Sequence, residues 1–348
     1  MSYKVIPKFL LLSTSLTLAF SLICLSRTYA PAEDKYWIGG MGSWFDDASW
    51  DPYGVPRPWV DNAFLTSSDE IDRTVYYDHD TFAECTILID AIGTGAMTLH
   101  VTEGCAGSYG MLQVGDKGTG TLIITGGSAG GRTQVGTNGT VELYEGSFMG
   151  LGMEALSLRG TVSQMGGTSL WDGMRVQFGG QYNISGGELS SIGFGFAGIV
   201  NQSGGDISGG GLGVSGTYNM SGGTLFSGAF SIDSTGIFNQ TGGINRAGLP
   251  GNAGTYNLSG GTLEFTDAGS PFFQWGDIRL LWRLPGSGRQ YIHQQRDCKS
   301  EWRWYPYVKR ECGKQRYLED YPHHRRIYWD FHQQRGLYQR PRRAVLQS

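Results

Sequence analysis

A short glycine-rich motif recurs through the middle of the chain at a nearly constant step. It takes forms such as GTYNMSGG and GIFNQTGG, and the first glycines of the pairs, with one degenerate copy at Gly146, are spaced by 20, 20, 20, 18, 18, 20 and 18 residues. The full copies end at Gly127, Gly167, Gly187, Gly205, Gly223, Gly243 and Gly261. A period this short and regular indicates a stack of repeated units.

Each repeat alternates apolar and polar residues over four positions, as in Tyr218-Asn219-Met220-Ser221, and then makes a Gly-Gly turn. Alternation with period two is typical of strands, and no window has helical periodicity. Eighteen to twenty residues hold two or three such strands with glycine corners. We therefore predict an all-β fold: a parallel β-helix (β-solenoid) with 18–20-residue coils about 4.8 Å apart, an N-terminal β-rich cap and an irregular C-terminal tail.

Two rows of equivalent positions follow from this register. We expect an inward apolar or aromatic ladder at Tyr182, Val200, Tyr218, Phe238 and Tyr256. The next position in each coil predicts a ladder of hydrogen-bonded amides at Asn183, Asn201, Asn219, Asn239 and Asn257. These asparagines also match the N-x-[ST] glycosylation pattern, but the repeat itself produces that match. GTYN-type coils alternate with coils of the G-I-[VF]-N-Q type, which indicates a duplicated two-coil unit of about 38 residues.

The first 32 residues are typical of a secretory signal peptide. Lys4 and Lys8 precede an apolar run from Phe9 to Leu25, and Ala30-Pro31-Ala32 fits the small-x-small rule for cleavage after Ala32. The alternative is an uncleaved anchor, although the apolar run is short for a membrane span. We expect a secreted or cell-surface protein of bacterial, extracytoplasmic location, which meets a membrane only through the signal peptide during export.

The five cysteines stand at positions 24, 85, 105, 298 and 312. Before the tail, the mature chain holds only Cys85 and Cys105. An export context permits a disulfide between them, and two unpaired thiols are the equal alternative.

The sequence divides into a signal peptide (1–32), a cap region (33–117), the glycine-rich repeats (118–276) and a tail (277–348). The cap region is less periodic and richer in Asp, Trp and Tyr, as expected of a segment that protects the first coil from edge pairing. Its tryptophans Trp37, Trp44, Trp50 and Trp59 are expected to pack, with stacking on sugar rings as the alternative.

The stretch YWIGGMGSWFDDASWDPYGVPRPWVDNAFLT, followed by VGDKGTGTLIITGG and GTYNLSGGTL, resembles exported bacterial repeat proteins. It is similar to autotransporter passenger β-solenoids and to secreted proteins with a PEP-CTERM sorting tail, over about residues 35–265. The resemblance implies a right-handed parallel β-helix, export to the cell surface or matrix, and usually no known enzymatic activity. The chain departs from it because neither a membrane barrel nor a PEP-type anchor closes the sequence.

The tail differs sharply in composition from the repeats. Residues 277–348 hold four glycines and sixteen Lys and Arg against seven Asp and Glu, whereas the preceding 276 residues hold eleven against twenty-four. A basic segment with many aromatic residues is typical of nucleic-acid binding. We instead predict no nucleic-acid partner, because the tail resembles the repeats translated in a neighbouring frame.

A glycine codon begins with GG, so DNA for Gly-Gly read one base early gives Trp and Arg codons that end in GG. Trp282-Arg283 and Trp302-Arg303-Trp304 have this signature, and His293-Gln294-Gln295-Arg296 recurs 39 residues later. Our hypothesis is a frameshift between about Glu264 and Gly276, which leaves a disordered tail without functional residues.

We expect the neighbouring frame of the gene to continue with GTY and SGG repeats beyond position 276. Sequencing the gene and translating that frame checks this. A neighbouring frame without such repeats would disprove the frameshift.

The repeats offer no clear catalytic cluster. Polysaccharide lyases and hydrolases need carboxylates and basic groups on one face, and we expect the charged residues of residues 118–263 to share no register: Glu142, Glu145, Glu154, Arg159, Asp172, Arg175, Glu188, Asp206, Asp233 and Arg246. Asp78-His79-Asp80 is expected to be a solvated loop rather than a metal site. We predict no catalytic residues, no metal and no cofactor.

These observations predict a structural or adhesin-like repeat protein that is not an enzyme. Its expected partner is a surface or matrix component. The alternative is an extracellular carbohydrate-binding or polysaccharide-cleaving β-helix protein.

Overall fold

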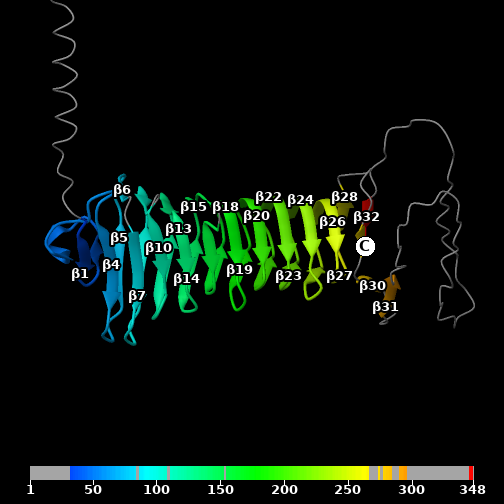
Figure 1. The fold of residues 1–348 in the computed structure, drawn as a ribbon, viewed down its shortest axis with the longest axis horizontal. Coiled ribbons are helices and arrows are strands. Elements are labelled where there is room, and N and C mark those ends of the chain that lie inside the picture. The colour runs from blue at the N-terminus through cyan, green and yellow to red at the C-terminus, as the bar shows by residue number, and fades with distance from the viewer. Residues whose placement is uncertain are drawn as a thin grey trace, which may run out of the picture.

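The computed structural model describes residues 32–83, 86–107, 110–152, 154–265, 273–274, 277–283, 290–295 and 345–347. These residues form about ten turns of a parallel β-solenoid, and their one helix is the short 3₁₀ helix η1 (Asp47–Ser49). Figure 1 shows the strands side by side across one long axis. The predicted all-β parallel β-helix is confirmed.

The strands belong to two long sheets that run along the solenoid. The strands of the first, which we call the narrow sheet, are β2 (Gly42–Ser43), β5 (Arg73–Tyr77), β8 (Met97–Val101), β11 (Gly120–Ile124), β14 (Gly139–Leu143), β17 (Thr161–Gln164), β19 (Gln181–Ile184), β21 (Ile199–Gln202), β23 (Thr217–Met220), β25 (Ile237–Gln240), β27 (Thr255–Leu258), β30 (Asp277–Arg283) and β31 (Gln290–Gln295).

The second, which we call the wide sheet, holds the remaining strands. They are β1 (Asp34–Trp37), β3 (Trp50–Asp51), β4 (Asn62–Ser67), β6 (Phe82–Ala83), β7 (Thr86–Ala91), β9 (Cys105–Ala106), β10 (Met111–Val114), β12 (Ser128–Gly130), β13 (Arg132–Val135), β15 (Ser147–Gly150), β16 (Leu156–Leu158), β18 (Thr168–Val176), β20 (Glu188–Phe196), β22 (Asp206–Val214), β24 (Thr224–Ile232), β26 (Ile244–Asn252), β28 (Thr262–Phe265), β29 (Phe273–Gln274) and β32 (Val345–Gln347). From β18 to β26 each wide-sheet strand has nine residues.

The corners explain why the chain is so rich in glycine. A Cβ on Gly222 would lie 2.3 Å from the carbonyl oxygen of Ser203 in the preceding coil, so the backbones approach too closely for any side chain. Gly223 has a φ of +75°, a conformation that glycine adopts at little steric cost. Each Gly-Gly pair therefore turns the chain from a strand of the narrow sheet into the next strand of the wide sheet.

The core is a set of inward rows that continue from coil to coil. Val75, Leu99, Leu122, Val141 and Val162 follow one another in parallel register and are fully buried. Tyr182 continues the same row. Because one coil cannot bury its apolar side alone, each row is buried only when neighbouring coils stack on it.

The coils begin earlier than the predicted boundary at residue 118. Strands β4, β7 and β10 pair in parallel in the wide sheet, and β5, β8 and β11 do so in the narrow sheet. The boundary was wrong because these first coils lack the Gly-Gly pair, and they advance by 24 residues from Val75 to Leu99 and by 23 to Leu122. The antiparallel pairing of β1 with β3 sets the preceding segment apart as the cap.

Several predictions fall on the ends of the chain. Residues 1–31 and both tail cysteines lie outside the described residues. Within the tail, β30 and β31 are strands although an irregular segment was expected, and β30 pairs in parallel with β27. The frameshift itself stays a hypothesis. In the described part of the chain, no helix has the length and apolar character to span a membrane.

We expect Gly223→Ala to destabilise the solenoid by about 1–3 kcal/mol, because alanine is strained at positive φ and its Cβ would clash with Gly205 of the preceding coil. The matched control is Gly211→Ala, whose Cβ meets nothing within 4 Å. The control should be neutral or stabilising by about 0.5–1 kcal/mol. Urea unfolding followed by circular dichroism measures the stability of both variants. Equal changes in the free energy of unfolding would contradict the conclusion that the corner requires glycine at Gly223.

Candidate functional site

The predicted inward ladder is confirmed. Tyr182, Val200, Tyr218, Phe238 and Tyr256 follow one another in register and are all buried. The rings of Tyr218 and Phe238 stack with centroids 4.6 Å apart, and those of Phe238 and Tyr256 at 4.8 Å. This row belongs to the core and offers nothing to a ligand.

The asparagine ladder is also confirmed and lies on the outer side of the same strands. Each Nδ2 donates to the Oδ1 of the preceding coil, from Asn201 to Asn183 (2.8 Å) and from Asn219 to Asn201 (2.9 Å). The chain continues from Asn239 to Asn219 and from Asn257 to Asn239, both at 2.8 Å. Because each amide is held by its neighbours, the row ties five coils together.

A buried set of tyrosine–glutamine pairs was missed by the sequence analysis. The hydroxyl groups of Tyr182 and Tyr218 donate to Oε1 of Gln164 and Gln202 at 2.7 Å, one coil back, and Tyr256 donates to Gln240. The three glutamines lie 38 residues apart, so these pairs explain the alternation of GTYN and G-I-[VF]-N-Q coils. That alternation was the signal that could have revealed them.

The same glutamines also hydrogen-bond to backbone carbonyl groups at the corners. Nε2 of Gln202 donates to the carbonyl oxygens of Gly205 and Thr224, at 3.1 and 3.0 Å. A buried amide that bonds both a phenol and two backbone carbonyls has most of its hydrogen-bonding capacity satisfied. The pairs therefore form a hydrogen-bonded network that links the coils to the corners.

Two acidic residues do share a register, contrary to expectation. Glu188 and Asp206 are direct neighbours in β20 and β22, with Thr168 and Thr224 in the flanking coils. The expectation was wrong because both follow a Gly-Gly pair, and the corner places them at the same point of each coil. Both residues are exposed.

A groove of about 760 Å³ lies on the outer side of the wide sheet, and we call it the glycine groove. It crosses strands β18 to β26. Two outward rows line it: Gly173, Gly193, Gly211 and Ala229 in one, and Arg175, Gly195, Gly213, Ser231 and Gly251 in the other.

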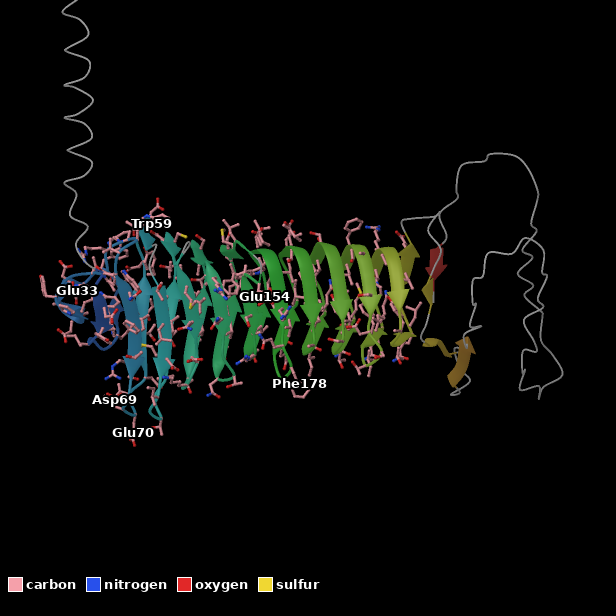
Figure 2. The ribbon with its side chains drawn as sticks, viewed as in Figure 1. Glu33, Trp59, Asp69, Glu70, Glu154 and Phe178 are labelled. Atoms are coloured by element: carbon pink, nitrogen blue, oxygen red, sulfur yellow. The ribbon has the colours of Figure 1, made fainter. Side chains whose placement is uncertain are left out.

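Between these rows lie four apolar residues whose side chains belong to the core. They are Met174, Phe194, Leu212 and Phe230, each no more than 5% exposed. At one end, Arg175 Nη1 pairs with Glu154 Oε1 at 2.8 Å. Glu154 has a φ of +58° and lies partway along the solenoid (Figure 2). The groove is thus apolar along its length, with one ion pair at its end.

Three of the four cap tryptophans are buried, as expected, and Trp59 is exposed. Trp37, Trp44 and Trp50 are at most 4% exposed, and Trp50 Nε1 donates to the carbonyl oxygen of Trp44 at 2.8 Å. Trp59 is 66% exposed and has a φ of +64°. Figure 2 places it near the N-terminal end of the solenoid.

The remaining polar candidates are the Asp78-His79-Asp80 segment and the two cysteines before the tail. His79 Nδ1 lies 3.0 Å from Asp78, whose carboxylate also accepts from Ser43, and no group of three or more metal-ligating side chains occurs among the described residues. Cys105 is a buried free thiol, so the structure has no disulfide there, and Cys85 lies outside the described residues.

Comparison with protein-family models, with curated proteins and with solved structures found no match to this chain. The resemblance to autotransporter passengers and PEP-CTERM proteins therefore stays an expectation.

Burial raises the pKa of Tyr182, Tyr218 and Tyr256 above the ordinary value of 10.0. The unfolded chain therefore loses these protons first as the pH rises. The stabilising contribution is complete below the unfolded pKa of about 10 and is lost as the pH rises from there towards the raised folded pKa.

We expect the free energy of unfolding to fall steeply above about pH 10, and less steeply in Tyr218→Phe, which removes one of the phenols whose pKa is raised by burial. Urea titrations between about pH 8 and 11 measure the slopes. Tyr53→Phe, at a tyrosine that is 75% exposed, is the control and should keep the wild-type slope. Equal slopes for all three proteins would refute the expectation.

Proposed function

We propose that this chain is a secreted or cell-surface structural protein of the adhesin type, without catalytic activity. The observation that carries the proposal is the continuity of its ladders: the asparagine amides link five successive coils, and stacked rings link the last three of them. A solenoid held by such nearest-neighbour contacts is a long scaffold with extended faces. Such faces provide a large area for binding a surface or matrix component.

Export with cleavage after Ala32 would leave Glu33 as the N-terminal residue, next to a buried carboxylate. The backbone N–H of Glu33 donates to Asp61 Oδ1 at 3.0 Å, and Arg57 donates to both oxygens of the same buried carboxylate. Although desolvation opposes it, the hydrogen bonds from Arg57 and Glu33 lower the pKa of Asp61. Cleavage would turn the Glu33 nitrogen into an ammonium group beside an ionised carboxylate.

We expect the chain, expressed in a bacterial host with its own N-terminal segment, to leave the cytoplasm and to begin at Glu33. The new ammonium group should stabilise the mature form through Asp61, because a charged donor strengthens this hydrogen bond. Cell fractionation and N-terminal sequencing measure both results. A cytoplasmic chain with residues 1–32 intact would contradict the proposal.

Polysaccharide cleavage is the second candidate, and the alignment of Glu188 with Asp206 favours it. Glycosidases use two carboxyl groups, about 5–5.5 Å apart in retaining enzymes, and neighbouring strands lie about 4.8 Å apart. Against it, both residues are exposed and neither lines the glycine groove. Release of reducing sugars by the wild type, abolished by Glu188→Gln with Asp206→Asn, would favour this candidate over the scaffold.

A further inference from the structure

The glycine groove contains glycines that the fold does not require. Ideal Cβ atoms on Gly193, Gly195 and Gly211 meet nothing within 4 Å, and one on Gly213 is in ordinary contact with Ser231 at 3.5 Å. None of the four has a positive φ. In the interior of a strand, each glycine costs about 0.5–1 kcal/mol relative to alanine. At these four positions no steric clash with a side chain explains why glycine is present.

Other glycines of the same strands behave differently. A Cβ on Gly209 would lie 2.5 Å from the ring of Phe194, and the corner glycines meet backbone at similar distances. Glycines inside a strand often mark a bulge, a tight bend, or a place where a ligand or another backbone approaches closely. Because these glycines line a groove rather than a corner, we take the glycine groove to be such a place.

The chemistry of the groove limits its occupant. The lining is mostly apolar, and its one charged pair, Glu154 with Arg175, is neutral as a unit. The Ser231 hydroxyl adds a polar group to one row. Up to residue 276 the chain has thirteen more acidic than basic residues, so an anionic polymer would be repelled. An uncharged occupant with apolar faces and a few hydroxyl groups fits best.

The shape limits the occupant further. The groove crosses five coils, about 19 Å from the first to the last at the usual strand spacing, and it runs across the strands rather than along them. An added peptide strand needs a free sheet edge, whereas β20, β22 and β24 are paired on both sides. The groove therefore suits a linear polymer that does not depend on backbone hydrogen bonds.

From these observations we infer that the glycine groove binds one chain of an uncharged polysaccharide, laid along the solenoid axis. The apolar faces of the sugar rings lie on the glycine rows, and hydroxyl groups at one end reach Arg175 and Glu154. The inference deepens the proposed adhesive role and rests on it, since it names the class of surface component that the scaffold holds.

The test uses the full-length chain and four neutral hexasaccharides: cellohexaose, laminarihexaose, xylohexaose and hexa-N-acetylchitohexaose. Isothermal titration calorimetry measures binding to the wild type, to Gly211→Ile and to the control Gly40→Ile. Gly40 lies in the cap, outside the groove, and its Cβ also meets nothing within 4 Å. A β-branched residue suits a strand, so Gly211→Ile should fold, and circular dichroism verifies this.

We expect at least one hexasaccharide to bind the wild type, Gly211→Ile to bind it about tenfold more weakly or not at all, and Gly40→Ile to bind as the wild type does. Hexagalacturonate, which is acidic, should bind more weakly than the best neutral sugar. No binding by any neutral sugar at millimolar concentration, or equal binding by Gly211→Ile, would overturn the inference.

Two further outcomes separate this inference from its alternatives. Self-association in sedimentation velocity that Gly211→Ile abolishes would assign the groove to a second copy of the chain and overturn the inference. A chain that is exported but binds no sugar would refute the groove assignment alone, whereas a cytoplasmic chain would refute the proposed function.

Discussion

The close approach of consecutive backbones at the glycine corners is the constraint on which the glycine-rich coils depend. Gly222 lies where any side chain would collide with the carbonyl oxygen of Ser203, and Gly223 takes a positive φ. Once each coil closes in the same way, equivalent residues of neighbouring coils lie in register. Equivalent side chains of successive coils are then in contact: asparagine amides hydrogen-bond to one another, and aromatic rings stack.

The strict register also decides where polar groups are tolerated inside. A buried phenol needs a hydrogen-bond partner, and stacking one tyrosine on another would not supply it. Tyr218 finds its partner in Gln202, one coil back. The two-coil superperiod therefore places a glutamine one coil before each tyrosine of the ladder.

The sequence alone predicted the fold and both ladders because alternation and glycine spacing are local patterns. It missed the first coils, where no Gly-Gly pair marks the corner, although β5, β8 and β11 stack like the later strands. It also missed the alignment of Glu188 with Asp206, which depends on counting from the corner. The groove lay beyond its reach, since Gly209 and Gly211 look alike in sequence and differ only in what surrounds their Cβ positions.

The place of the groove within the solenoid follows from how repeat proteins share stability. Each coil is stabilised mainly by its neighbours. Strands that are weakened by glycines with no steric role therefore destabilise the solenoid least when they lie between coils linked by many hydrogen bonds. Gly193 and Gly211 lie on β20 and β22, and the coils around them carry the Tyr182–Gln164 and Tyr218–Gln202 bonds and the asparagine ladder. An end coil lacks one neighbour. The interior is therefore where a glycine-lined surface costs the solenoid least.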